Sequence, residues 1–384
     1  MPEINILDTL FGSLTGDGFG WKQIVMWVIG ATLIFLAIRF EMEPTLLLPM
    51  GFGAILVNLP LADTLGVAGE EGVINILFNA TIGNELLPLL LFIGIGAMID
   101  FEPLLRNPKL MLFGAAAQFG IFFTLCTAYL FGFDILEAAS IAIIGAADGP
   151  TSIYVAGELI GDVEKSKHIV GAIIVAASSY MALVPIVQPP VIRLLTTKKE
   201  RMIRMGDVNA KPVPKLLKIC FPVLVSIVAG IVAPQSAALV GFLMFGNLIR
   251  ECGVLNSLSD TAQKVLANLV TLLLGITVAF TMKAEDFLRG STLLILGLGL
   301  VAFVFDTAGG VLFAKVLNLF SKKKINPMIG AAGISAFPMS SRVIHKMGIK
   351  EDPTNFLLMH AAGANVAGQI ASVIAGGLIL GFFG

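Results

Sequence analysis

One acidic side chain, Asp148, lies inside an apolar stretch, in the run IGAADGP at residues 144–150. Glycine and proline prevent a continuous helix here, and a carboxylate placed in hydrocarbon costs free energy. Broken helices within a membrane are tolerated where their freed backbone groups face protein or a polar cavity, and such places commonly hold an ion or a substrate. Asp148 therefore predicts an ion site, although a carboxylate at this position could instead only cap the helix that follows.

A hard monovalent cation such as Na⁺ prefers oxygen ligands from carboxylates, amides, hydroxyls and unwound backbone. Two apolar stretches interrupted by Gly, Pro and Ser supply such groups, at residues 135–156 and 326–342. The candidate Na⁺ ligands in these stretches are the side chains of Asp148, Thr151, Ser152, Asn326 and Ser335. Of these, we expect Asp148 and Asn326 to contact the ion most directly. Asn326 precedes a proline, however, and this pattern is also typical of a helix cap.

Four further polar residues in or beside apolar stretches are candidates for chemistry. Arg342 ends the second stretch, where its guanidinium suits an anionic group arriving from the cytoplasm or simply anchors the segment at the membrane surface. Tyr180 could transfer a proton or line the ion site, or it could only pack with one hydrogen bond. Asn365 is a polar group within an apolar span. Asp306 is a second intramembrane carboxylate, with either a structural or a functional role.

The composition defines the class of protein. Of the 384 residues, 57% are hydrophobic and 13% are charged, whereas about 25% are charged in a typical soluble domain. We therefore predict an all-α, multi-pass protein of the cytoplasmic membrane, surrounded by lipid, with about ten transmembrane helices. The three cysteines and three histidines form no known metal-binding pattern, which argues against a transition-metal site. With a net charge of −1, nothing supports binding to nucleic acid.

The chain contains an internal duplication. The tetrapeptide at residues 144–147 recurs at 329–332, 185 positions later, and the Leu-Leu-Arg at 104–106 is matched by Phe-Leu-Arg 183 positions later. The same offset places Tyr180 opposite Asn365. We infer two copies of one unit, each built as span, span, broken segment, span.

Charge sets the relative orientation of the two copies. Acidic residues precede the first broken segment, three lysines precede the second, and a strongly basic segment follows the first copy. The positive-inside rule then gives the copies opposite topology. Each broken segment must enter and leave on one side, so we expect two opposed re-entrant hairpins in an inverted repeat. This architecture suits an elevator-like core that moves against a scaffold.

The expected division of the chain follows from these patterns. It comprises an N-terminal segment 1–83 with two transmembrane helices, a first repeat 84–188 with a hairpin at 135–156, a basic cytoplasmic loop 189–218, linking transmembrane helices 219–262, and a second repeat 263–384 with a hairpin at 326–342.

Three motifs, in order, carry a resemblance to a known family. They are GAADGPTSIYVA at 145–156, SSYMALVPIVQPPV at 178–191 and INPMIGAAGISAFPMSSRV at 325–343. The chain closely resembles the β subunits of sodium-pumping, biotin-dependent decarboxylases of oxaloacetate, methylmalonyl-CoA and glutaconyl-CoA, most clearly from residue 84 to the end. The resemblance implies a membrane enzyme subunit that decarboxylates carboxybiotin and couples this reaction to Na⁺ export, consuming a proton.

The resemblance also implies residue roles. Asp148 matches the sodium-binding and catalytic aspartate of the family, and Tyr180 matches its functional tyrosine. The functional positions of the second hairpin correspond to Asn326, Gly330, Ser335 and Arg342. As a hypothesis, Arg342 holds the carboxylate, Tyr180 or a water relays the proton, and Na⁺ at Asp148, with Asn365 among its ligands, controls which side the core faces.

The resemblance further implies partners. No Lys in a Met-Lys-Met context occurs in the chain, so the biotin must be carried by a partner and not by this chain. The expected partners are a cytoplasmic carboxyltransferase subunit, a biotin carrier protein or domain, and a small single-span membrane subunit, in a complex in which this chain is a trimer. Two alternatives remain open from the residues alone. One is a Na⁺-coupled secondary transporter of an organic anion without decarboxylase activity, and the other is a passive membrane anchor, which would need neither hairpins nor Asp148.

Overall fold

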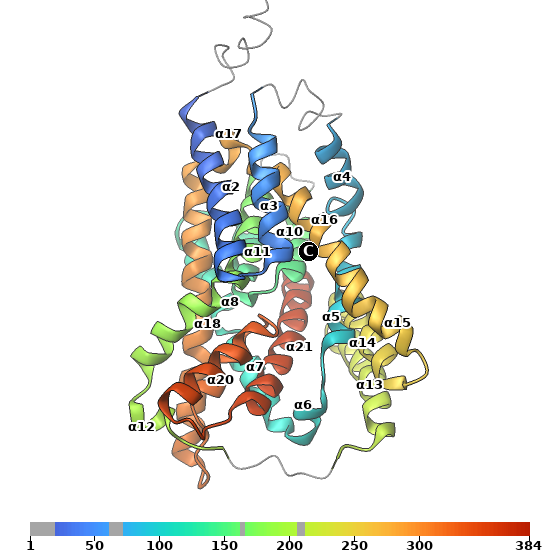
Figure 1. Cartoon of the computed structure of the whole chain (residues 1–384), viewed down its shortest axis with the longest axis vertical. Coiled ribbons are helices and arrows are strands. Elements are labelled where there is room, and N and C mark those ends of the chain that lie inside the picture. Colours follow the sequence, from blue (N-terminus) through green and yellow to red (C-terminus); the bar gives the residue numbers. More distant parts are fainter. Residues whose placement is uncertain (1–19, 61–71, 162–165, 206–211) are drawn as a thin grey trace, which may run out of the picture. The chain divides into compact units, whose positions relative to one another are not determined.

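The computed structural model describes residues 20–60, 72–161, 166–205 and 212–384 (Figure 1). Every regular element in these ranges is a helix, as the composition predicts. Seven of the described helices are long and apolar enough to cross a membrane, or eight if the bent pair α4 (Val73–Thr81) and α5 (Leu86–Met98) forms one span. The seven are Trp21–Phe40, Pro108–Leu130, Ile169–Leu195, Lys215–Val232, Asn256–Met282, Gly290–Phe320 and Leu358–Phe383. The expectation of about ten spans stays a prediction.

The chain divides into two compact units, and the first consists of residues 1–87 and 269–294. In its described part, α2 (Trp21–Phe40) packs along α3 (Pro44–Val57). The two helices approach closely at Gly30 and Gly51, because a Cβ on either glycine would lie 2.6 Å from the carbonyl oxygen of the other. Small residues of this kind allow transmembrane helices to pack backbone to backbone.

The second unit consists of residues 88–268 and 295–384 and contains the predicted site residues. The first half of the chain supplies α6 (Glu102–Arg106), η1 (Pro108–Leu110), α7 (Met111–Ala117), α8 (Phe119–Leu130), α9 (Ile135–Ala142), η2 (Ile143–Ala146), α10 (Gly149–Ile160), α11 (Lys167–Leu195) and α12 (Lys198–Arg201). The linking helices are α13 (Lys215–Val232), η4 (Pro234–Ser236), α14 (Ala237–Cys252), α15 (Asn256–Asp260) and the π-helical η5 (Thr261–Leu266).

The last third of the chain repeats the order of elements found in the first half. It runs through α16 (Ala267–Val278), η6 (Ala279–Met282), α17 (Ala284–Phe287), α18 (Gly290–Phe320), α19 (Met328–Ala331), α20 (Met339–Glu351) and α21 (Leu358–Phe383). With α5 counted before α6, both sets read as an apolar helix, a short helix, a long span, a broken helical segment and a long final helix. This order is what the duplication predicts, although the inverted orientation of the copies stays a prediction.

The two broken segments are helices interrupted by turns. In the first, α9 and η2 lead into Ala147, which has a left-handed backbone with φ of 53°, and into the extended Asp148, after which α10 begins and packs back against α9. In the second, α19 and α20 are joined by a turn over residues 332–338. Whether either segment is re-entrant in a bilayer stays a prediction.

Two boundaries differ from those expected. The helix α20 continues beyond 342 to Glu351, because the next helix-breaking signal is Asp352 before Pro353. The helix α11 continues to Leu195, through Pro189 and Pro190, so the basic connection begins later than position 189. Proline removes one helical hydrogen bond, which a long helix held by its neighbours can tolerate.

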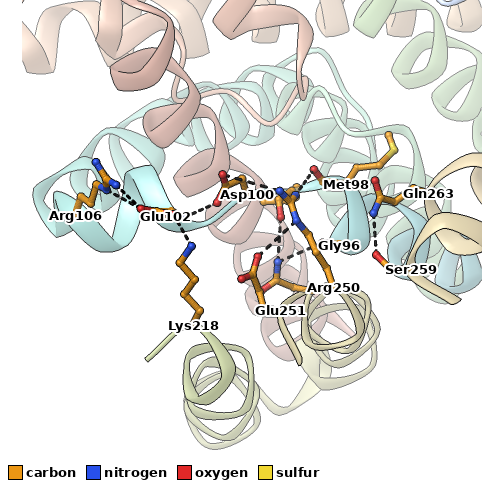
Figure 2. Close-up of polar contacts among 12 residues, drawn as sticks. Gly96, Met98, Asp100, Glu102, Arg106, Lys218, Arg250, Glu251, Ser259 and Gln263 are labelled. Atoms are coloured by element: carbon orange, nitrogen blue, oxygen red, sulfur yellow. Dashed lines mark hydrogen bonds and ion pairs between the residues drawn. The ribbon is translucent and has the colours of Figure 1, made fainter. Parts of the chain in front are cut away.

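In the second unit, a network of ion pairs and hydrogen bonds joins the connection between α5 and α6 to α13 and α14 (Figure 2). Glu102 accepts a hydrogen bond from Arg106 Nε at 2.9 Å and also pairs with Lys218 at the start of α13. Arg250, near the end of α14, donates to the Met98 carbonyl at 2.8 Å. The hydrogen bond from Lys218 keeps the pKa of Glu102 below its ordinary value, against the opposing effect of burial.

Candidate cation site between the two broken segments

Asp148 occupies the N-cap position of α10 and is 3% exposed. Its carboxylate oxygen Oδ2 accepts a hydrogen bond from the Thr151 hydroxyl at 2.6 Å. The Ser152 hydroxyl donates to the backbone carbonyls of Asp148 at 2.9 Å and Ile143 at 3.2 Å, which ties the turn together. An aspartate at a helix start is therefore combined with two hydroxyls from the first turn, in a stretch, residues 138–153, in which every residue is buried.

Gln369 on α21 supplies the second donor to Asp148. Its Nε2 lies 2.8 Å from Asp148 Oδ2, and the side chain is 2% exposed. The hydrogen bonds from Thr151 and Gln369 thus end on the same carboxylate oxygen, and both come from neutral groups. Neutral donors stabilise a buried carboxylate without cancelling its charge.

The two broken segments meet at their turns. The Ser335 hydroxyl, from the turn of the second segment, donates to the carbonyl of Ala146 in the turn of the first. Ser335 is 2% exposed and Ala146 is equally buried. The interrupted stretches that the sequence placed 185 positions apart are therefore in direct contact.

Asn365 on α21 holds the second segment and leaves one oxygen without a partner. Its Nδ2 donates to the Ile334 carbonyl at 2.6 Å, which fixes the orientation of the carboxamide. Its Oδ1 is buried, and no group in the described part of the chain donates to it. Asn365 and Gln369 are one helical turn apart, so α21 contacts both turns, one through each carboxamide. A buried carbonyl oxygen without a donor is a group that a cation would satisfy.

The predicted site residues divide into two sets. The structure brings together Asp148, Thr151, Ser152, Ser335 and Asn365. It places Tyr180, Asn326, Gly330 and Arg342 in other contacts, as described below.

Asn326 lies at the entrance to the second segment. Its Nδ2 donates to the carbonyls of Arg201 at 2.8 Å and Ile203 at 2.9 Å, and its Oδ1 accepts from the Met328 amide at 3.1 Å. Asn355, beyond the end of α20, donates to the same two carbonyls at 3.2 and 3.3 Å. The side chain of Asn326 thus caps the start of the segment and holds the basic connection against it, while a role as a sodium ligand stays a prediction.

Gly330 lies against α18. A Cβ at Gly330 would overlap the carbonyl of Gly310, and a Cβ at Gly310 would overlap the carbonyl of Gly330. The glycine therefore permits a close contact between two backbones, which is a sufficient reason for its presence.

The contacts of Tyr180 and Arg342 are with groups other than the Asp148 carboxylate. The Tyr180 phenol donates a hydrogen bond to the Leu296 carbonyl of α18. A different residue of α11, Ser178, places its hydroxyl beside the Asp148 turn, at Gly149. Arg342, in the first turn of α20, is exposed and forms no ion pair with any residue that the structure describes. Its guanidinium is free to bind an anion.

Comparison with known proteins decides the family. A model of the family described as the Na⁺-transporting oxaloacetate decarboxylase beta subunit matches residues 22–383. The chain belongs to this family. The match confirms the resemblance carried by the three motifs and extends it to the region before residue 84. It also establishes this chain as a membrane protein of a sodium-pumping decarboxylase family, in agreement with its apolar helices.

Relatives that act on different substrates resemble the chain about equally. The methylmalonyl-CoA decarboxylase subunit beta of Propionigenium modestum is 47% identical over 391 residues, with 96% of each chain covered. The glutaconyl-CoA decarboxylase subunit beta of Acidaminococcus fermentans is 47% identical over 366 residues, with 95% of this chain and 94% of that one covered. The oxaloacetate decarboxylase beta chain of Klebsiella pneumoniae is 43% identical over 432 residues, with 97% and 98% covered.

Gln369 is the residue of this beta-subunit site that sequence reasoning missed. The signal was available, because Gln369 follows Asn365 by four positions in an apolar helix and both therefore share a face. Its partner in the other copy of the duplication would be Val184, so the repeat gave no indication of a polar role.

Proposed function

We propose that this chain decarboxylates carboxybiotin presented by a partner subunit and uses the reaction to export Na⁺ across the cytoplasmic membrane. Membership of the beta-subunit family supports this function over a transporter without decarboxylase activity. The observation that carries the proposal is the buried cluster around Asp148. In it, the turn that holds the carboxylate contacts the turn of the other broken segment, and α21 contacts both turns and carries an amide oxygen to which no described group donates.

The sodium site in this proposal is built from oxygens of both turns. Asp148 supplies the negative charge, and its oxygen Oδ1, which takes part in neither the Thr151 nor the Gln369 bond, faces the ion. Asn365 Oδ1 and the hydroxyl oxygen of Ser335 are further ligands of the ion. A carboxylate, an amide and a hydroxyl form the hard oxygen set that Na⁺ prefers. Because the ligands belong to two segments, binding of Na⁺ stabilises the arrangement in which the turns touch.

Arg342 binds the anionic substrate in this proposal. Its exposed guanidinium has no carboxylate partner among the described residues, and guanidinium groups bind carboxylates through two parallel hydrogen bonds. In the reaction, the bond between the carboxyl carbon and the ring nitrogen breaks, CO₂ leaves and the nitrogen gains a proton. Exclusion of water and a positioned proton donor both favour this step. Tyr180 is the candidate donor, directly or through water.

The partners in this proposal are a cytoplasmic carboxyltransferase subunit, a biotin carrier protein or domain, and a small single-span membrane subunit, with this chain as a trimer. The relatives support a division of labour, because beta subunits from complexes with three different substrates are 43 to 47% identical to this chain. Selection of the carboxylated substrate therefore belongs to the carboxyltransferase and not to the beta subunit.

The test is decarboxylation by the reconstituted complex in proteoliposomes, with free carboxybiotin as substrate, in the presence and absence of Na⁺. We expect CO₂ release that is stimulated by Na⁺ and accompanied by movement of radiolabelled Na⁺. Movement of Na⁺ without CO₂ release, with competent partner subunits present, would refute the proposal in favour of a carrier.

A further inference from the structure

A second carboxylate, Asp306, lies in the middle of α18 and is 1% exposed. Its Oδ1 accepts a hydrogen bond from the backbone amide of Gly120 at 2.6 Å. Gly120 is in the first turn of α8, immediately after the interruption at Gln118 between α7 and α8. The first backbone N–H groups of a helix have no partner within the helix, so they are suited to bind a carboxyl oxygen.

The other oxygen of Asp306 faces the turn of the first broken segment. Oδ2 is buried, and no described group forms a hydrogen bond with it. It lies 2.9 Å from the position that a Cβ would occupy at Gly145, one residue before Ala146. The Asp306 carboxyl is thus held between the broken α7–α8 helix and the turn that leads to Asp148, and the glycines at 120 and 145 make room for it.

Among the described residues, no opposite charge pairs with Asp306. Oδ2 pairs with no titratable side chain that is described on α18, on α8, on α11 or on the helices of the first broken segment. These side chains are Cys126, Tyr129, Glu137, Asp148, Tyr154, Glu158, Tyr180, Arg193 and Lys315. Of these, Glu137 accepts from Ser166, Tyr180 donates to Leu296, and Lys315 pairs with Glu200. An ionised carboxylate without a counter-charge is costly within an apolar, membrane-spanning helix.

The groups that line Oδ2 on the side of the Gly145 turn are not cation ligands. The groups closest to the position of a Gly145 Cβ, besides Oδ2 itself, are the Ala302 Cβ and the Ile121 amide, both at 3.2 Å, and neither is an oxygen ligand. Na⁺ requires several oxygens, whereas a proton requires no additional room. A proton on Oδ2 would remove the charge and leave the bond to Gly120 intact.

We propose that Asp306 is a proton-binding site whose occupancy is linked to the position of the first broken segment. The inference rests on the proposed function, in which the core moves and a proton is consumed. With the turn at Gly145 packed over it, Asp306 is the neutral acid. When the turn moves away, water reaches Oδ2, the O–H bond breaks, and the proton passes to that water and leaves a carboxylate. Because the proton binds the closed arrangement more tightly, the pH shifts the balance between the two arrangements.

The test combines infrared spectroscopy with pH-dependent kinetics on the reconstituted complex. The wild-type complex should show the carbonyl-stretch band of a protonated carboxylic acid at neutral pH. The band should remain in Asp148→Asn, which removes the other intramembrane acid of the site, and should be absent in Asp306→Asn. This readout needs no decarboxylation, so it is independent of whether the proposed function is correct.

Asp306→Asn retains an acceptor for Gly120 and is permanently neutral. We expect it to lower the rate of Na⁺-stimulated CO₂ release at least about tenfold and to flatten its dependence on pH, as loss of a proton-transfer group does. Asp306→Ser, a smaller variant, should have the same effect if Asp306→Asn does not fold. Absence of the band from the wild type, or an unchanged pH profile in a folded variant, would overturn the proposal. So would a raised Na⁺ requirement with an unchanged pH profile, which would indicate a sodium ligand. Failure of the proposed function would instead appear as no Na⁺-stimulated CO₂ release by the wild type.

Discussion

The contact between Gln369 and Asp148 permits a quantitative test of the cation site. In the wild type, Gln369 Nε2 donates to Asp148 Oδ2 at 2.8 Å. In Gln369→Met the side chain keeps its length and burial but cannot donate this hydrogen bond. A hydrogen bond to a charged group contributes about 1.5–3 kcal/mol, and about 1.4 kcal/mol corresponds to a tenfold change in an equilibrium constant. If the ionised form of Asp148 binds Na⁺, loss of the bond makes that form less stable, so Na⁺ must be roughly 10- to 100-fold more concentrated for half-maximal activity.

The assay is CO₂ release by the reconstituted complex, measured over a range of Na⁺ concentrations at fixed pH. Gln188→Met is the matched control, because Gln188 is also fully buried but donates to the neutral Ala331 carbonyl at 2.9 Å. We expect its half-maximal Na⁺ concentration to be that of the wild type. A wild-type Na⁺ dependence in folded Gln369→Met would refute the inference that the Asp148 carboxylate binds the ion in this arrangement.

Three further outcomes are expected. Gly330→Ala should lower the melting temperature of the purified chain strongly, because its Cβ would overlap a carbonyl of α18, whereas Gly297→Ala on that helix, with nothing within 4 Å, should not. Arg342→Gln should raise the KM for free carboxybiotin more than tenfold, because the loss of one hydrogen bond to a charged group corresponds to about that change in an equilibrium constant. The Na⁺ dependence should not change. The hydrogen bond from Arg204 lowers the pKa of Asp352 from 3.8 to about 2. A carboxyl group whose pKa is lower in the folded than in the unfolded state stabilises the fold at pH values above its unfolded-state pKa. The melting-temperature difference between wild type and Asp352→Asn should therefore be constant from about pH 8 to 5 and decline only below about pH 4.

Part of the site could be predicted because membrane physics makes its residues conspicuous. Asp148, Thr151, Ser152 and Ser335 are polar groups beside helix-breaking residues in apolar stretches, and such groups are tolerated only in a polar environment. The helical class followed from composition, and the contact between the two turns is consistent with the repeat.

The remaining features depend on tertiary packing that local sequence does not encode. Whether Asn326 ligates an ion or caps a helix depends on what its amide faces, and the same Asn-Pro pattern serves either role. Gln369 reaches Asp148 only because of the rotation of α21 against the first broken segment. The continuation of α11 through Pro189 and Pro190 likewise reflects stabilisation by neighbouring helices, which outweighs the local preference of proline.

The most direct test of the account is Asp148→Asn in the reconstituted complex, with simultaneous measurement of CO₂ release and uptake of radiolabelled Na⁺. Glu158→Gln is the matched control, since Glu158 is an exposed carboxylate on the same helix. If Asp148 binds the transported ion, Asp148→Asn should fold but lose Na⁺ uptake and the stimulation of CO₂ release by Na⁺, while Glu158→Gln should retain both. Normal, Na⁺-dependent transport by Asp148→Asn would contradict it.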